Sequence, residues 1–95
     1  MLILSVVGCA SPDRTFWGVD PVEVVIDERR YVVYAQTDAR RPRVQVIRMG
    51  YARRAEHVAI LQAMRQAAVQ VSGCALVEGS VQGDSGVLTA RLDCH

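Results

Sequence analysis

Lysine is absent from this chain of 95 residues, and aromatic side chains make up only 5% of it. All eleven basic residues are therefore arginines, and ten acidic residues nearly balance them. No apolar run approaches the roughly 20 residues that a membrane-spanning helix needs. Because 51% of the residues are hydrophobic, the composition predicts a folded chain and excludes an intrinsically disordered one. The length fits a single domain.

The residue patterns of common catalytic and metal sites are also missing. No serine stands in the context of a nucleophile elbow, and the three cysteines are too far apart for a Cys-x-x-Cys metal motif. We interpret His57, the only histidine within a predicted element, as a hydrogen-bonded residue between sheet and helix. We therefore predict no catalytic residue, metal ligand, cofactor or small-molecule substrate. The alternative, an enzyme of unrecognised type, requires a cleft that gathers His57 with at least one carboxylate.

Alternation of β-branched residues predicts strands, and a change to the helical period predicts one helix. The predicted strands are residues 22–27, 31–36, 43–49, 74–81 and 86–94. Between Tyr51 and Val71 one arc is apolar, as in a helix packed on a sheet, and Gly73 is placed to end that helix. The order β-β-β-α-β-β predicts an α+β fold, a two-layer sandwich in which one antiparallel sheet packs one amphipathic helix on one face.

The first ten residues, MLILSVVGCA, form a short apolar run that ends in Val6-Val7-Gly8-Cys9. This run resembles the lipobox of bacterial lipoproteins. In that family the cysteine thiol receives a diacylglyceryl group, and cleavage just before it makes it the first mature residue. No basic residue precedes Cys9, so the signal peptide is short or begins upstream of Met1. In the alternative interpretation, residues 2–7 are a buried first strand and Cys9 is a small core residue.

The resemblance divides the chain into three parts. Residues 1–8 are the remnant of a signal peptide, residues 9–21 a lipid-anchored tether, and residues 22–95 a single α+β domain. Two prolines and a glycine in residues 10–21 argue against a helix there. Phe16 and Trp17 either cover the edge of the core or, since aromatic residues favour membrane interfaces, contact lipid headgroups. We expect the core.

The resemblance also accounts for the odd cysteine. If Cys9 is lipidated, Cys74 and Cys94 remain as a pair, and disulfides persist in oxidising compartments such as the bacterial periplasm. Pairing these two cysteines sets the register of the last hairpin, with its apolar residues on one face. In that register the facing residues are Leu76 with Leu92, Glu78 with Ala90 and Ser80 with Leu88.

Eight of the eleven arginines fall between Arg29 and Arg54, where only Asp38 opposes them. Arginine side chains suit phosphates and carboxylates. The candidate residues for binding an anion or a partner are Arg40, Arg41, Arg43, Arg53 and Arg54. The alternative is a solvated surface neutralised by nearby acidic residues.

Together these patterns predict a small cell-envelope lipoprotein with a structural or protein-interaction role and no catalytic activity. Acylated Cys9 would tether it to a bacterial membrane on the periplasmic face, with the bilayer and an envelope protein as partners. Ala10 rather than aspartate after the cysteine resembles lipoproteins that are sent on to the outer membrane, so the resemblance favours the outer over the inner membrane. The alternative is an unanchored α+β protein that binds an anionic partner through residues 29–54. Nucleic acid is not expected, since the total charge is balanced.

Overall fold

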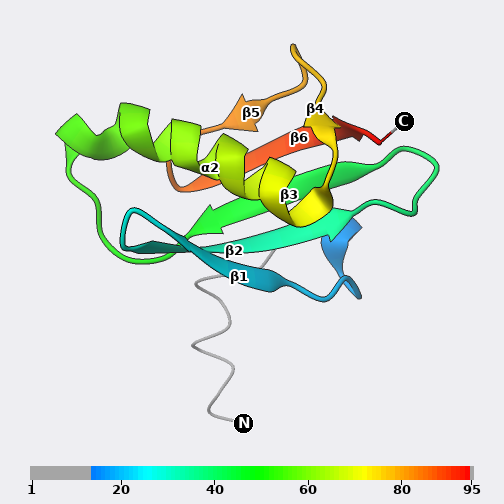
Figure 1. The fold of residues 1–95 in the computed structure, drawn as a ribbon, viewed down its shortest axis with the longest axis horizontal. Coiled ribbons are helices and arrows are strands. Elements are labelled where there is room, and N and C mark those ends of the chain that lie inside the picture. Colours follow the sequence, from blue (N-terminus) through cyan, green and yellow to red (C-terminus); the bar gives the residue numbers. More distant parts are fainter. Residues whose placement is uncertain (1–13, 95) are drawn as a thin grey trace, which may run out of the picture.

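The structure, a computed structural model, describes residues 14–94 of the chain. A curled antiparallel sheet packs one helix on one face, which confirms the predicted α+β fold (Figure 1). The elements are η2 (Arg14–Phe16), β1 (Val22–Ile26), β2 (Arg29–Gln36), β3 (Arg43–Arg48), η3 (Arg54–Glu56), α2 (His57–Ser72), β4 (Ala75–Leu76), β5 (Gln82–Gly83) and β6 (Val87–Asp93). The strands follow the order β1-β2-β3-β6-β4, and β5 also pairs with β6.

The core lies between α2 and the inner face of the sheet. Because side chains alternate along a strand, Val44 and Val46 of β3 and Leu88 and Ala90 of β6 point toward the helix and are buried. From α2 the core receives Ile60, Ala63, Met64, Ala67 and Ala68. Three of these five are alanines, which let the helix approach the sheet closely.

The helix begins six residues later than the sequence predicts, at His57 instead of Tyr51. Arg53 has extended backbone angles, and its N–H donates to Glu56 Oε1 at 2.8 Å. This hydrogen bond satisfies a backbone donor at the start of the helical segment. At the other end Gly73 adopts a left-handed conformation and donates to the Val69 carbonyl at 2.8 Å, as expected for a helix C-terminus.

The last hairpin has the predicted register only where it begins. Leu76 pairs with Leu92 as predicted. Beyond that pair the chain turns at residues 78–79, and Gln82 then pairs with Thr89. The predicted pairs Glu78 with Ala90 and Ser80 with Leu88 are therefore wrong.

A local excursion of the chain explains this shift of three residues. Ser80 Oγ accepts a hydrogen bond from the Arg91 N–H at 3.0 Å and donates to the Val77 carbonyl, which closes the gap in the ladder. The odd-numbered shift exchanges the two faces of the chain. Val81 instead of Ser80 consequently packs against the core.

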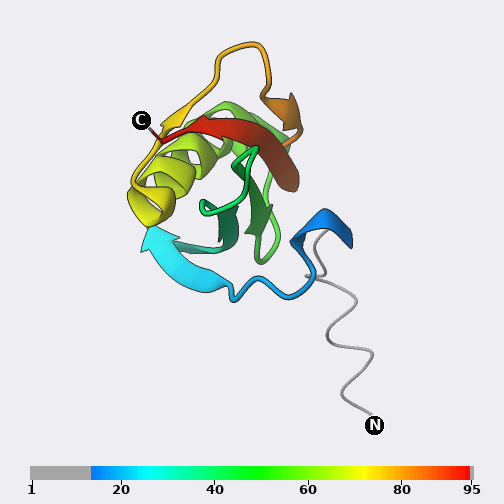
Figure 2. The ribbon, with the colours of Figure 1, turned by 90° about the vertical axis from the view of Figure 1, so that its right-hand side faces the viewer.

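The outer face of the sheet, which points away from α2, is also partly covered. Gln45 and Ile47 of β3 are buried on that face. The η2 turn contacts β2 and lies on the opposite side of the sheet from α2 (Figure 2). Phe16 is buried as predicted, whereas Trp17 is 67% exposed, so its predicted place at the core edge is wrong. Because the two residues are adjacent in a tight turn, they point in different directions, and Arg14 lies 5.8 Å from the centroid of the Trp17 ring.

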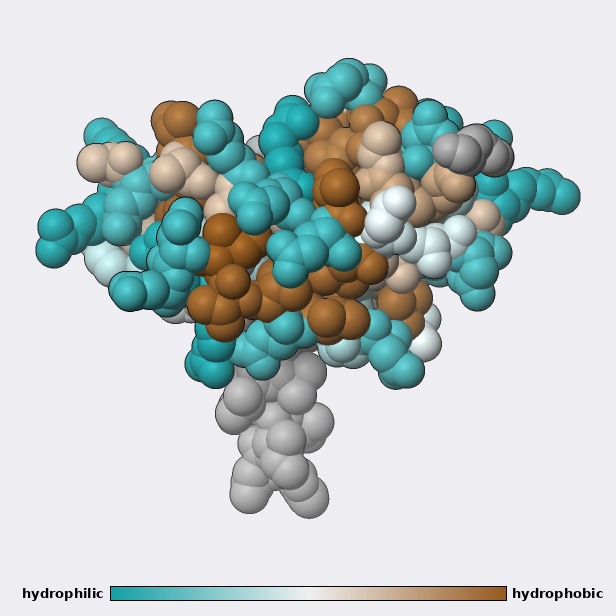
Figure 3. Space-filling view, in the orientation of Figure 1, coloured by the Kyte–Doolittle hydropathy of each residue, from teal (hydrophilic) through white to brown (hydrophobic). Residues whose placement is uncertain are grey.

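Apolar side chains also reach the surface on the α2 side of the molecule. The space-filling view shows apolar surface below α2, over the first two strands (Figure 3). Val22 and Val25 of β1 are exposed, and β1 is an edge strand.

Candidate functional site

The five arginines singled out by the sequence lie at opposite ends of the sheet. Arg40, Arg41 and Arg43 belong to the β2–β3 loop, residues 37–42, or to the first position of β3. Arg53 and Arg54 precede α2 and follow the other end of β3 (Figure 1). A strand of that length spans roughly 20 Å. The structure therefore does not bring the five residues into one cluster.

Four other arginines have partners within the domain. Three of them form salt bridges: Arg29 with Glu56 at 3.3 Å, Arg30 with Glu23 at 3.3 Å, and Arg65 with Glu78 at 3.4 Å. The fourth, Arg48, donates hydrogen bonds to the carbonyls of Ser85 at 3.0 Å and Gly50 at 3.2 Å. Arg48 in particular joins the end of β3 to the turn before β6. These four side chains connect elements of the fold and are less available to a ligand.

We define the loop end of the sheet as residues 37–42 with the adjoining ends of β3 and β6. It carries arginines that form no salt bridge with another described residue. Arg43 and Arg91 are direct partners in the β3–β6 register. Both point to the outer face, because their neighbours Val44 and Ala90 are buried in the core. Within residues 14–94 neither guanidinium forms a salt bridge. Like charges directly opposite each other destabilise a sheet, so this pair has an unfavourable position that a bound anion would relieve.

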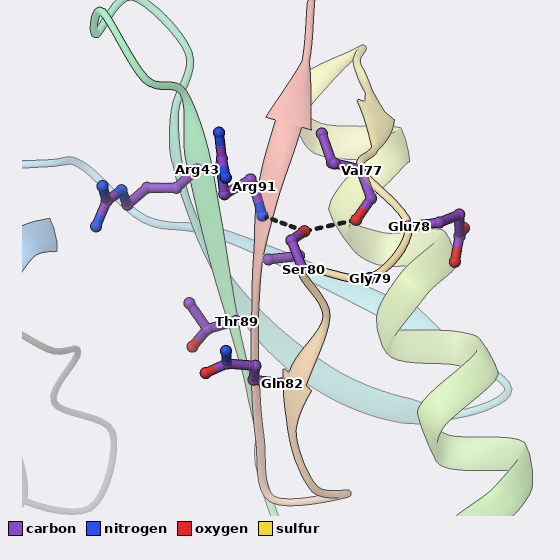
Figure 4. Close-up of a pocket in the computed structure, with 9 residues that line it drawn as sticks. Arg43, Val77, Glu78, Gly79, Ser80, Gln82, Thr89 and Arg91 are labelled. Carbon is purple, nitrogen blue, oxygen red and sulfur yellow. Dashed lines mark hydrogen bonds between the residues drawn. The ribbon is translucent and has the colours of Figure 1, made fainter.

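Arg91 is not among the arginines that the sequence indicates, because nothing in the sequence shows that β3 and β6 are neighbours. Beside Arg91 the excursion of residues 77–81 leaves a surface hollow of about 540 Å³, which is also lined by Ser80, Gln82 and Thr89 (Figure 4). The Arg43 guanidinium points away from this hollow in that view. The hollow therefore offers hydroxyl and amide groups, whereas the positive charge spreads over the outer face of the loop end.

A second hollow, at the start of α2, brings His57 close to Asp84, Ser85 and Arg48. The enzyme alternative required such a combination of histidine and carboxylate. However, Asp84 Oδ1 accepts hydrogen bonds from the N–H groups of Gly86 at 2.8 Å and Val87 at 3.1 Å.

These two hydrogen bonds lower the pKa of the Asp84 carboxyl below its ordinary value. Ser85 is buried, and Arg48 Nη1 donates to its Oγ at 3.4 Å. No hydrogen bond joins His57 to either residue in the described part of the chain. The cluster therefore orders a turn and does not pair a nucleophile with a base.

Cys74 and Cys94 form a disulfide with a Cα–Cα distance of 4.6 Å, as predicted. The bond joins the residue before β4 to the residue after β6, and Cys74 is buried against the core. The other predicted modification site, Cys9, and the proposed signal peptide lie outside the described residues.

Over residues 14–94, no three His, Cys, Asp or Glu side chains gather in a way that would hold a metal ion. No helix in the same range has the length and apolarity needed to cross a membrane. No protein-family model matches the chain, and neither a curated protein nor a solved structure shows significant similarity to it.

Proposed function

We propose that the chain is a small lipoprotein of the bacterial cell envelope, held on a membrane through acylated Cys9. The observation that carries this proposal is the disulfide between Cys74 and Cys94. It uses both cysteines of the domain and leaves Cys9, within its lipobox-like sequence, as the one remaining thiol of the chain. A disulfide in so small a domain also favours an oxidising compartment such as the periplasm.

The proposed anchor is stable because lipoprotein cysteines carry several acyl chains, and two or more chains bind a bilayer much more tightly than one. The domain then acts on the periplasmic face, on the outer membrane in preference to the inner membrane. Its role is structural or protein interaction within an envelope assembly. This role is supported by the polar side chains around His57, since Arg48 and Asp84 form hydrogen bonds that hold the turn before β6.

The test is the intact mass of the protein from a membrane fraction of its native host, measured beside a Cys9→Ala variant. We expect a chain that starts at Cys9 and carries added acyl groups, and we expect both features to be lost in the variant. An unmodified soluble chain that retains Met1 would refute the proposal.

An unanchored binding protein for an anionic partner is the second candidate. The observation in its favour is that Arg43, which faces Arg91 in the neighbouring strand, forms no salt bridge with any residue of the range 14–94. This candidate predicts an intact N-terminus together with binding that weakens strongly as salt is added.

A further inference from the structure

We propose that the loop end of the sheet rests on the membrane surface, with Trp17 in the headgroup layer and the arginines of this end against anionic headgroups. This inference rests on the proposed anchor at Cys9 and adds to it an orientation, an interaction surface and a lipid class. Three features of the described residues support it.

The first feature is the short distance along the chain between the anchor and the domain. Four residues, 10–13, separate Cys9 from Arg14, the first residue of η2. Even fully extended, five Cα-to-Cα steps cover at most about 18 Å. An acylated Cys9 lies at the bilayer surface, so η2 is held within that distance of the headgroups. The face that carries η2 therefore meets the membrane first, and α2 on the opposite side faces away (Figure 2).

The second feature is the exposed tryptophan on η2's flank. Trp17 is 67% exposed, whereas Phe16 beside it is 1% exposed. Tryptophan combines a large apolar ring with one N–H donor, and it is enriched where a membrane meets water. The Arg14 guanidinium near the Trp17 ring adds a cation at the same place. A tryptophan within reach of a lipid tether is thus suited to the headgroup layer.

The third feature is the charge of the loop end. Arginines without a salt bridge to any residue in the range 14–94 gather there, namely Arg40, Arg41, Arg43 and Arg91. Two acidic residues, Asp38 and Asp93, lie at the same end. The guanidinium groups suit the phosphates of anionic lipids, and such lipids would relieve the repulsion between Arg43 and Arg91.

Trp17 provides its own probe, because it is the only tryptophan of the chain. The acylated protein from the native membrane fraction is reconstituted into vesicles of phosphatidylethanolamine and phosphatidylglycerol, and its mass is measured on the same sample. We expect tryptophan emission at shorter wavelengths than in detergent-free water, protection from acrylamide, and quenching by brominated lipids. Vesicles of phosphatidylcholine should show a smaller effect.

Matched charge variants test the surface. Arg43→Gln with Arg91→Gln removes two charges from the loop end, and Arg53→Gln with Arg54→Gln removes two from the opposite end. Each basic residue near an anionic membrane contributes about fivefold to binding, so the first pair should weaken docking about 25-fold and the second should leave it nearly unchanged.

The outcomes separate this inference from the proposed function. An unacylated chain overturns both. An acylated chain whose Trp17 stays open to acrylamide on anionic vesicles overturns only the docking surface, as do equal losses in the two arginine pairs. Protection of Trp17 in native membranes but not in pure lipid vesicles would assign the surface to a protein partner and also overturn the lipid assignment.

Discussion

Gly83 occupies a backbone position that a side chain would disrupt. Its φ is +112°, and a Cβ placed there would lie 2.1 Å from the Val87 carbonyl oxygen. Gly83 and Val87 belong to the same hairpin, in which the Asp84 N–H donates a hydrogen bond to the Val87 carbonyl at 2.9 Å. The contact is with backbone, so β6 itself must move to make room.

We therefore expect Gly83→Ala to lower the free energy of unfolding by more than about 4 kcal/mol, measured by urea denaturation. Gly79→Ala is the matched control, because Gly79 also has a positive φ but open space around it. The control should lose only about 1–2 kcal/mol, the cost of a left-handed conformation. Equal losses in the two variants would contradict the role of close approach at Gly83.

Asp84 links the stability of the domain to pH. Hydrogen bonds from the N–H groups of Gly86 and Val87 lower the pKa of its carboxyl. Because the folded-state pKa lies below the unfolded-state value, the carboxylate stabilises the fold above pH of about 4. This stabilisation is lost as the pH falls through the folded-state pKa.

Asp84→Asn keeps an oxygen acceptor for the two N–H groups but cannot titrate. We expect its free energy of unfolding to fall less than that of the wild type as the pH is lowered from about 5 to about 2. Denaturant titrations at several pH values provide the measurement. Parallel curves for the two proteins would show that Asp84 does not contribute to the pH dependence.

At the scale of elements, the sequence predicted the fold class and the longer strands more accurately than the start of the helix and the connections between elements. The β-branched residues Val44 and Val46 predicted β3 correctly, since strand propensity and the alternation of side chains are local properties, although Gln45 and Ile47 between and after them are buried as well. The start of α2 was misplaced, because residues 51–56 were included in the helix although its apolar arc begins at His57; Arg53 is extended and residues 54–56 form a 3₁₀ turn. Periodicity alone does not show where helical hydrogen bonds begin.

The excursion at residues 77–81 was hidden for a different reason. It depends on Ser80 replacing a backbone partner of Arg91, which is a tertiary hydrogen bond without a sequence signature. The candidate site was also predictable only in part, because it too depends on tertiary contacts that the sequence does not show. Arg43 was recognised from the clustering of arginines, whereas its opposition to Arg91 depends on the order of strands in the sheet.

The disulfide stabilises an element that is otherwise small. β4 contributes only Ala75 and Leu76 to the sheet, and the bond between Cys74 and Cys94 closes a loop with a sequence separation of 20. Restricting a loop of that length in the unfolded chain contributes about 3 kcal/mol.

We expect the double variant Cys74→Ala with Cys94→Ala to lose about 3 kcal/mol in urea denaturation. With all proteins produced without acylation, Cys9→Ala is the control for replacing a cysteine outside the disulfide and should keep the stability of the wild type. Reductant should then destabilise the wild type and leave the double variant unchanged. A Cys9→Ala variant as unstable as the double variant would contradict this assignment.

At the scale of the whole molecule, α2 and the curled sheet share a single core within residues 14–94. The core contains residues from β1, β2, β3 and β6 as well as α2. Separating any of these four strands from the helix would therefore disrupt the packing of the others. The two ends of the sheet differ instead in charge pairing. At the end near the start of α2, Arg29 of β2 forms a salt bridge with Glu56, whereas the arginines of the loop end remain without salt bridges in the part of the chain that is described.

A shared core predicts that sheet and helix unfold together. Met64 is fully buried in the middle of α2, and Tyr31 of β2 is 1% exposed in the same cluster. We expect Met64→Ala to lower the free energy of unfolding by about 2–5 kcal/mol. Far-ultraviolet circular dichroism follows the helix, near-ultraviolet circular dichroism follows the packing of the aromatic side chains, to which Tyr31 of the core contributes, and both transitions should shift together.

Gln66→Ala, on the exposed side of the same helix, is the matched control and should change stability by less than about 0.5 kcal/mol. We expect the two spectroscopic transitions to coincide in the wild type and in both variants. If the near-ultraviolet signal disappeared while the helix persisted, the sheet would have a stability of its own. The domain would then consist of two separately stable layers, in conflict with the single cluster that joins Met64 to Tyr31.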